Sequence, residues 1–148
     1  MKRRLRITLV LPLLVLAACA DATLQKVAKD LDIVAHTVGA VQTAVLDANR
    51  QMLFSDASTR AILESCLKVN LAGQQAVAYT RTISQLDAVS REQLIVIMRP
   101  AIYAAGNLVQ NGTLGITDAP TQQKIQLLLS TLQATLNGIQ IAIAGGGQ

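Results

Sequence analysis

The sequence predicts an all-α fold, an antiparallel up-and-down four-helix bundle that could consist of two tandem αα-hairpins. Apolar residues recur at alternating spacings of three and four in four long segments, as on one face of an α-helix. Turn and capping residues separate these segments by short connections, which favour antiparallel neighbours. The chain has 148 residues, enough for a core that needs no disulfide or metal. We therefore expect helices at about 24–53, 58–86, 91–110 and 119–144, and a flexible glycine-rich tail at 145–148.

The first expected helix, 24–53, has the longest regular pattern. A helix of this length extends roughly 45 Å at about 1.5 Å per residue. Its apolar and small residues form the seam of a bundle or coiled coil. They are Leu24, Val27, Leu31, Val34, Val38, Val41, Val45, Ala48 and Met52.

The second expected helix, 58–86, follows the segment Phe54-Ser55-Asp56-Ala57-Ser58-Thr59, which is rich in residues that cap helices. Its seam has small residues in the middle, where two backbones can approach closely, so we expect tight packing against another helix. The seam residues are Ile62, Cys66, Val69, Gly73, Ala76, Thr80 and Ile83.

The third expected helix, 91–110, begins at Ser90-Arg91-Glu92-Gln93, which has the form of a capping box. Pro100 lies inside this helix and lacks an amide hydrogen, so we expect a kink or a break there. Asn111-Gly112 and Gly115 end the helix. Its apolar residues are Leu94, Ile97, Met98, Ala101, Ala105 and Leu108.

The fourth expected helix, 119–144, begins after Ile116-Thr117-Asp118-Ala119-Pro120-Thr121, with the proline in its first turn. This hexapeptide aligns with Phe54-Ser55-Asp56-Ala57-Ser58-Thr59 at an offset of 62 residues, and Leu46 then aligns with Leu108. A duplicated hairpin and convergent turn chemistry both explain the similarity. The seam of the fourth helix is Ile125, Leu128, Leu132, Leu136, Ile139 and Ile143.

The first 18 residues have the pattern of an export signal. Four cations, Lys2, Arg3, Arg4 and Arg6, precede an apolar run from Ile7 to Leu16, which is short for a membrane-spanning helix. We expect residues 1–18 to be removed as a signal peptide, leaving residues 19–148 as a single helical domain.

The end of this signal, Leu16-Ala17-Ala18-Cys19, resembles the lipobox of bacterial lipoproteins. The resemblance implies that the Cys19 thiol receives a diacylglycerol, that cleavage occurs just before Cys19, and that the new amino terminus is acylated. Because Ala20 rather than aspartate follows, it also implies the periplasmic face of the outer membrane more than the inner membrane. Ordinary secretion with cleavage after Ala18-Cys19-Ala20, and an uncleaved signal anchor, are the alternatives.

The net charge of +4 is due to the signal, because nine cations and nine acids remain after Lys2, Arg3, Arg4 and Arg6 are removed. The mature chain has no basic cluster either. This balance excludes a nucleic-acid-binding protein, which needs a basic surface.

No motif for catalysis, a metal or a cofactor is recognisable. The single histidine, His36, has only Asp32 at helical spacing, and metal sites need three or four ligands. The acids form no acid/base pair, and no serine or threonine has a basic partner in a known motif. Cys66 is expected to be a small buried apolar residue; an intermolecular disulfide or a reactive thiol is the alternative. We expect neither an enzyme nor a bound cofactor.

The last third of the chain is almost uncharged, since only Asp118 and Lys124 follow Arg99. Neutral polar residues form their own stripe beside the apolar seam, which argues against a transmembrane helix. Such a stripe is either a solvated face or a contact surface for a partner or a second copy, because interface cores are depleted in charge. Its members are Gln126, Ser130, Gln133, Asn137 and Gln140.

These observations predict a non-catalytic lipoprotein, held at the cell envelope through acylated Cys19, that acts by contact with a protein partner or a second copy. One alternative is a carrier of a small apolar ligand, with a cavity beside Gly73, Ala76, Gly106 and Pro100. Another is an immunity or superinfection-exclusion lipoprotein of the kind that phages encode.

Overall fold

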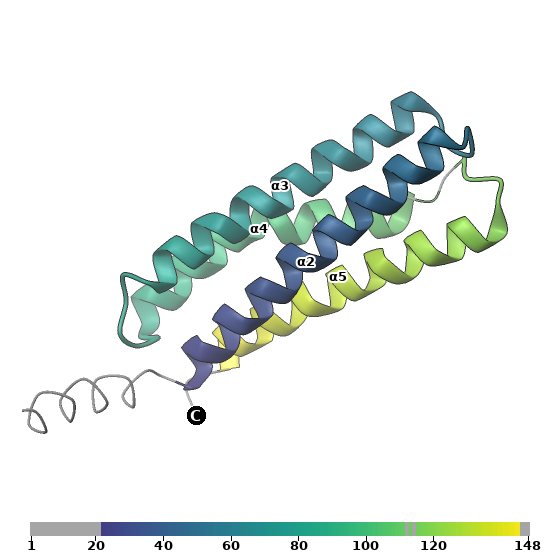
Figure 1. Ribbon diagram of the computed structural model, residues 1–148. Helices are drawn as coiled ribbons and strands as arrows, with labels where there is room; N and C mark the ends of the chain where they lie inside the picture. The colour runs from purple at the N-terminus through teal and green to yellow at the C-terminus, as the bar shows by residue number, and fades with distance from the viewer. Residues whose placement is uncertain (1–21, 112, 114, 146–148) are drawn as a thin grey trace, which may run out of the picture.

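The computed structural model describes residues 22–145 except 112 and 114, and these residues form four long helices. They are α2 (Ala22–Arg50), α3 (Asp56–Thr80), α4 (Ala88–Asn111) and α5 (Ala119–Gly145), shown in Figure 1. The described residues contain no strand, which confirms the all-α fold. The signal peptide 1–18, Cys19 and the tail residues 146–148 lie outside the described residues.

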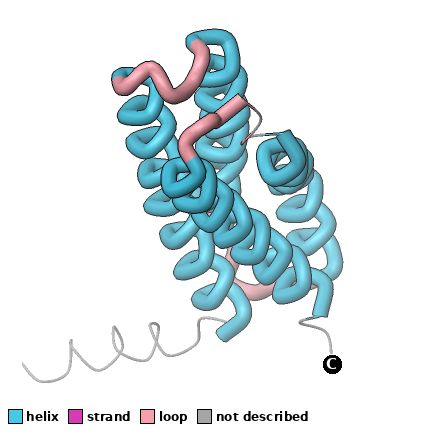
Figure 2. The backbone as a smooth tube through the Cα atoms, turned by 90° about the vertical axis from the view of Figure 1, so that its right-hand side faces the viewer, coloured by secondary structure: helices cyan, strands magenta, loops and turns pink. Residues whose placement is uncertain are grey.

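The four helices form an antiparallel up-and-down bundle, as predicted (Figures 1 and 2). Each helix packs against two neighbours in the closed order α2, α3, α4, α5, and within the described residues the diagonal pairs make no close contact. The beginning of α2, the α3–α4 connection and the end of α5 lie at one end, called here the Ala22 end (Figure 1). The other two connections lie at the opposite end.

The core contains most of the predicted seam residues. In α2, every one from Leu24 to Ala48 is buried, whereas Met52 is 93% exposed. Ile83, Ile97 and Leu128 are half-buried, because each lies at the edge of the stripe that its segment buries. The core also includes residues outside the predicted seams, since a helix in a bundle buries a stripe wider than two columns. In the helices these are Ala44, Ala72, Ala104 and Leu129, and the connections add Phe54, Leu86 and Ile116.

The first helix ends at Arg50, three residues earlier than predicted. The Leu53 amide donates to the Ala48 carbonyl at 3.0 Å, and Met52 has a φ of 58°. This is the arrangement of a Schellman motif, in which glycine usually occupies the left-handed position. The next helix begins at Asp56 rather than at residue 58, because the Ser55 hydroxyl oxygen accepts a hydrogen bond from the Ser58 amide.

The second helix ends at Thr80, so the prediction that it continues to residue 86 is wrong. The hydroxyl of Thr80 donates to the Val77 carbonyl and that of Thr82 to the Tyr79 carbonyl, both at 2.8 Å. The same two carbonyls also accept backbone amides, from Arg81 to Val77 at 3.3 Å and from Thr82 to Tyr79 at 2.9 Å, so the hydroxyls add a second hydrogen bond at the helix end. The chain then turns before Asp87.

The third helix begins at Ala88, three residues before the predicted start, and Ser90 is not its N-cap. Asp87 is the cap, since its carboxylate accepts the Ser90 amide at 2.8 Å and the Ser90 hydroxyl at 2.7 Å. Arg91 donates to the Leu86 carbonyl at 2.8 Å and to the Ile143 carbonyl at 3.3 Å. It thereby links this helix start to the C-terminus of α5, where a cation is favourable.

Pro100 does not break α4, which continues from Ala88 to Asn111. The fourth helix begins at Ala119, as predicted, and ends at Gly145. Asp118 caps it, because its carboxylate accepts the Thr121 amide at 2.9 Å.

The two hairpins, α2–α3 and α4–α5, bury residues in matching registers, but not at the offset of 62 found in the sequence. The buried residues Leu94 to Leu108 of α4 lie 60 positions after Val34 to Ala48 of α2. Five of the six buried residues of α5 lie 63 positions after buried residues of α3; the exception is Leu136, which corresponds to the half-buried Gly73. Leu46 is 38% exposed while Leu108 is buried, so the aligned residues are not structurally equivalent.

Candidate functional site

The neutral stripe lies on the outside of α5. Gln126, Ser130, Asn137 and Gln140 are exposed and Gln133 is half-buried. Gly138, Ile141 and Ala142 line a surface depression with Ala22 and Lys26 of α2, so Ile141 lies between this side of the helix and the stripe. The core face of α5 packs inside the bundle. Helical geometry therefore places the stripe on the remaining side, toward α4 and solvent.

Two large apolar residues beside the stripe were missed by the sequence reasoning. Leu127 is 68% exposed and Ile141 is 71% exposed, and the small Ala134 lies midway between them, also exposed. The three are seven residues apart, so they lie in one column along the helix. This spacing was available in the sequence, but the apolar seam of the same helix obscured it.

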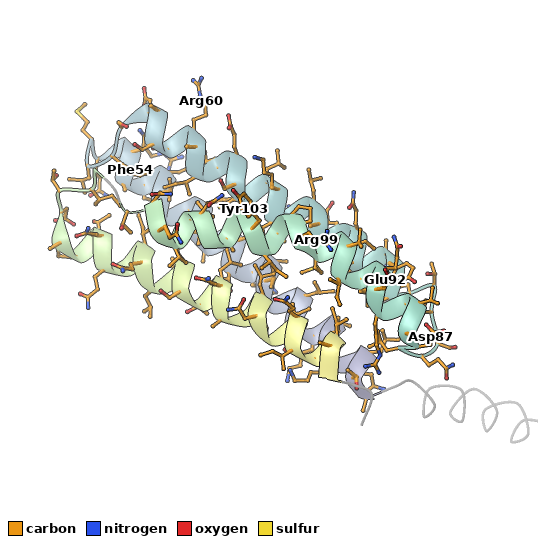
Figure 3. All side chains as sticks on the ribbon, turned by 180° about the vertical axis from the view of Figure 1, so that it is seen from behind. Phe54, Arg60, Asp87, Glu92, Arg99 and Tyr103 are labelled. Atoms are coloured by element: carbon orange, nitrogen blue, oxygen red, sulfur yellow. The ribbon has the colours of Figure 1, made fainter. Side chains whose placement is uncertain are left out.

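Charge distinguishes this face from the rest of the bundle. On the α3 and α4 side, Arg60, Glu92 and Arg99 project outward (Figure 3). In α5 the only charged side chain is Lys124. Among the described residues, α5 is the one helix whose length and mean hydropathy, 1.4 over an 18-residue window, would allow it to cross a membrane, and 28% of that window is buried in the bundle.

His36 and Asp32 lie together on the surface of α2. The His36 Nε2 is 3.6 Å from an Asp32 carboxylate oxygen, and the two side chains are 82% and 74% exposed. In the part of the chain that the structure describes, no three His, Cys, Asp or Glu side chains are grouped so that they could hold a metal. The pair is therefore a surface contact within one helix.

Cys66 is fully buried in α3, as predicted. Burial raises the pKa of its thiol to about 11, because the thiolate would lose its hydration. The thiol thus stays protonated at neutral pH, where the thiolate is the reactive form.

Among the described residues, two carboxylates have shifted pKa values, Asp87 and Asp118, and both cap helices. The pKa of Asp87 is lowered mainly by hydrogen bonds from the backbone and side chain of Ser90. That of Asp118 is lowered by hydrogen bonds from the side chain and backbone of Thr121. Both shifts follow from capping, so these groups have a structural role.

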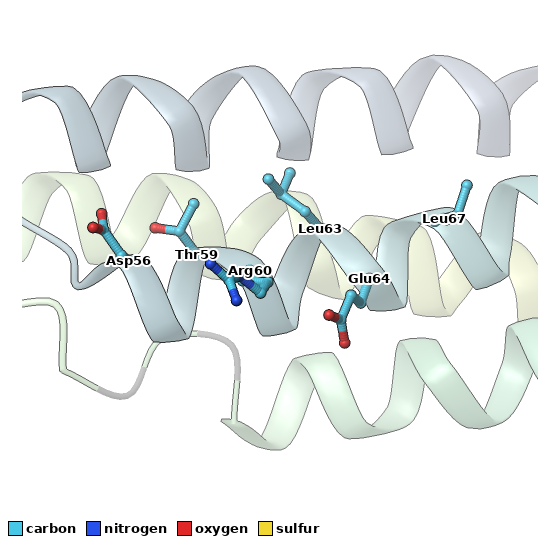
Figure 4. A pocket seen from close by; sticks show the side chains of 6 residues that line it. All are labelled: Asp56, Thr59, Arg60, Leu63, Glu64 and Leu67. Atoms are coloured by element: carbon cyan, nitrogen blue, oxygen red, sulfur yellow. The ribbon is translucent and has the colours of Figure 1, made fainter.

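The surface depressions do not resemble an enclosed ligand site. One of 390 Å³ is lined only by side chains of α3, among them Thr59, whose buried hydroxyl has no hydrogen-bond partner, and Leu63 (Figure 4). Another, of 280 Å³, lies between α2 and α3 and is lined by Gly73, Val77 and Arg81, with seven further residues. The residues named for a cavity do not meet there, since Ala76 is buried in the core and Pro100 is exposed.

Cys19 precedes α2 by three residues, since α2 begins at Ala22. The Ala22 end of the bundle is therefore the end nearest to any lipid on Cys19.

Comparison with known proteins finds no family model, no curated protein and no solved structure that matches the chain. The site is therefore interpreted from its own geometry.

Proposed function

We propose that this chain is a non-catalytic lipoprotein of the bacterial cell envelope, anchored through acylated Cys19 and acting by protein contact. The observation that supports contact is the outer face of α5. It exposes Leu127 and Ile141 among neutral polar side chains, and no charged residue follows Lys124 in this helix. Protein interfaces have such a composition at their centres.

The anchor is supported by Leu16-Ala17-Ala18-Cys19 and by the position of Cys19 just before α2. Two or more acyl chains hold a protein stably on a membrane, whereas one holds it only marginally. The proposed location is the periplasmic face of the outer membrane. Cys19→Ser should abolish acylation and membrane retention, and mass spectrometry of a wild-type chain that begins unmodified at Asp21 would refute the anchor.

The contact surface is tested by Gln133→Glu combined with Gln140→Glu. The double variant should keep the circular dichroism and melting of the wild type but lose partner capture or self-association, because each glutamate would place a desolvated charge in the interface. Gln75→Glu with Gln93→Glu, at exposed positions of α3 and α4, is the matched control. If the double variant on α5 binds and sediments like the control, the stripe is a solvated face.

An alternative is that the protein carries a small apolar ligand. The depression beside Gly73 supports it, but its 280 Å³ is below the roughly 300–1,000 Å³ of ordinary ligand pockets. Recovery of a lipid or metabolite with the purified protein would favour it. An immunity or superinfection-exclusion role would use the same contact face with one specific foreign protein, which a pull-down from membranes would identify.

A further inference from the structure

The outer face of α5 repeats every seven residues. In the heptad notation of coiled coils, the exposed residues Leu127, Ala134 and Ile141 are a positions. The neutral stripe then fills two more columns of the same heptad. Its members are the d positions Ser130 and Asn137 and the g positions Gln126, Gln133 and Gln140. Together the stripe and the apolar column, called here the α5 outer seam, have the layout of a helix–helix contact.

We propose that the α5 outer seam binds the same seam of a second copy of this chain, in a parallel two-fold pair. The pairing rests on the proposed function for its orientation, because a shared membrane makes the two copies parallel. The pairing identifies the partner that binds the contact face, which the proposed function does not specify.

The absence of charge favours a second copy over an unrelated protein. In a parallel two-fold pair each a or d residue meets its own counterpart, so a charge at an a or d position would face an identical charge. Residues 125–145 contain no Asp, Glu, Lys or Arg. A different partner could match a charge at an a or d position with an opposite charge, whereas a self-paired seam cannot.

A lipid surface fits this seam less well. Helices that lie in a membrane interface have a wide apolar face bordered by lysine and arginine. The α5 outer seam has one narrow apolar column bordered by amides and hydroxyls, and Lys124 is the only cation in α5. Its composition therefore suits another helix better than a bilayer.

The anchor determines the direction of pairing. Cys19 lies three residues before α2, and α5 ends at the same end of the bundle (Figure 1). An antiparallel pair would place the two anchors at opposite ends of a bundle about 40 Å long, from 27 residues at about 1.5 Å each. Copies that stand on one membrane are parallel instead, and confinement raises their effective concentration, so a seam with few large side chains is sufficient.

Disulfide trapping tests the pairing in the full lipidated chain in bacterial membranes. After oxidation with copper phenanthroline, Leu127→Cys alone and Ile141→Cys alone should each shift to twice the monomer mass on a non-reducing gel. Val96→Cys is the matched control, because residue 96 is 49% exposed in a column of the same spacing on α4, Val89, Val96 and Tyr103, but this helix carries charged residues. It should remain monomeric, as should the wild type with its buried Cys66.

A second substitution tests whether the pairing depends on the uncharged seam. Ala134→Glu, added to Leu127→Cys, should abolish the disulfide dimer, because each glutamate would face its copy. Ala134→Gln has nearly the same size without the charge and should retain the dimer. Residue 134 is exposed, so thermal unfolding of both variants should match that of Leu127→Cys alone.

Three outcomes would overturn the pairing. If both cysteines stay monomeric and react with a water-soluble maleimide, nothing covers the seam. If they stay monomeric but are protected in membranes, lipid or another protein covers it. If only a mixture of Leu127→Cys and Ile141→Cys cross-links, the pair is antiparallel. Lipidation of Cys19 is measured separately by mass spectrometry. If the chain is not lipidated, the same cross-links are measured on the soluble domain at high concentration.

Discussion

Two leucines of α5 provide the sharpest test of the bundle, because the same substitution has opposite expectations at the two positions. Leu132 is completely buried, whereas Leu127 is 68% exposed. Replacing Leu132 with alanine removes three buried carbon atoms, a loss of about 2.4 kcal/mol at about 0.8 kcal/mol for each. The cavity left behind adds to this loss, so we expect a decrease of about 2–5 kcal/mol in the free energy of unfolding.

Leu127→Ala is the matched control and should change the free energy of unfolding by less than about 0.5 kcal/mol. The measurement is thermal or urea unfolding of dilute soluble domain, followed by far-ultraviolet circular dichroism. For a domain of this size, the loss at Leu132 corresponds to a melting temperature lower by roughly 6–20 °C. Equal effects of the two substitutions would refute the orientation of α5 in the bundle.

Further substitutions and titrations test individual sites. Met52→Gly should raise the free energy of unfolding by about 1 kcal/mol in urea titrations, because glycine adopts the φ of 58° without strain and the side chain is 93% exposed. Asp118→Asn should make the free energy of unfolding less dependent on pH in acid. Hydrogen bonds lower the pKa of Asp118 in the folded state. Its stabilisation is therefore present above the unfolded pKa of about 3.9 and disappears as pH falls through the folded pKa. The Cys66 thiol should react slowly with a thiol reagent in the folded protein and rapidly in urea. Its folded pKa of about 11 exceeds the ordinary thiol pKa of 9.0, so its contribution to stability should be lost as pH rises between these values.

The number, order and direction of the helices could be predicted from the sequence, because the periodicity of apolar residues is a property of the whole segment. The core faces followed for the same reason, as in the buried series from Leu24 to Ala48. The lipidation of Cys19, by contrast, remains a prediction, since Cys19 lies outside the described residues.

Helix ends were less predictable, because several residues in each connection can cap a helix. At residues 87–90, both Asp87 and Ser90 have the chemistry of an N-cap, and only the structure assigns the cap to Asp87. At the end of α2, a methionine occupies the left-handed position, where a glycine would have marked the helix end. At the end of α3, the hydroxyls of Thr80 and Thr82 donate to the Val77 and Tyr79 carbonyls, and the place of Thr80 in the predicted seam conceals this use.

The candidate contact surface was only half predicted, because two periodic patterns are superposed in α5. The core face follows spacings of three and four from Ile125 to Ile143, and the outer column Leu127, Ala134 and Ile141 follows a spacing of seven. Each pattern alone describes an amphipathic helix, but their sum gives the mean hydropathy of a membrane-spanning segment. A helix that packs in a bundle needs only the first pattern. An exposed column of the same spacing, Val89, Val96 and Tyr103, also occurs in α4, so the missing charges distinguish α5 and the spacing alone does not. The proposed contact with another uncharged helix would account for both the apolar column and the missing charges of α5.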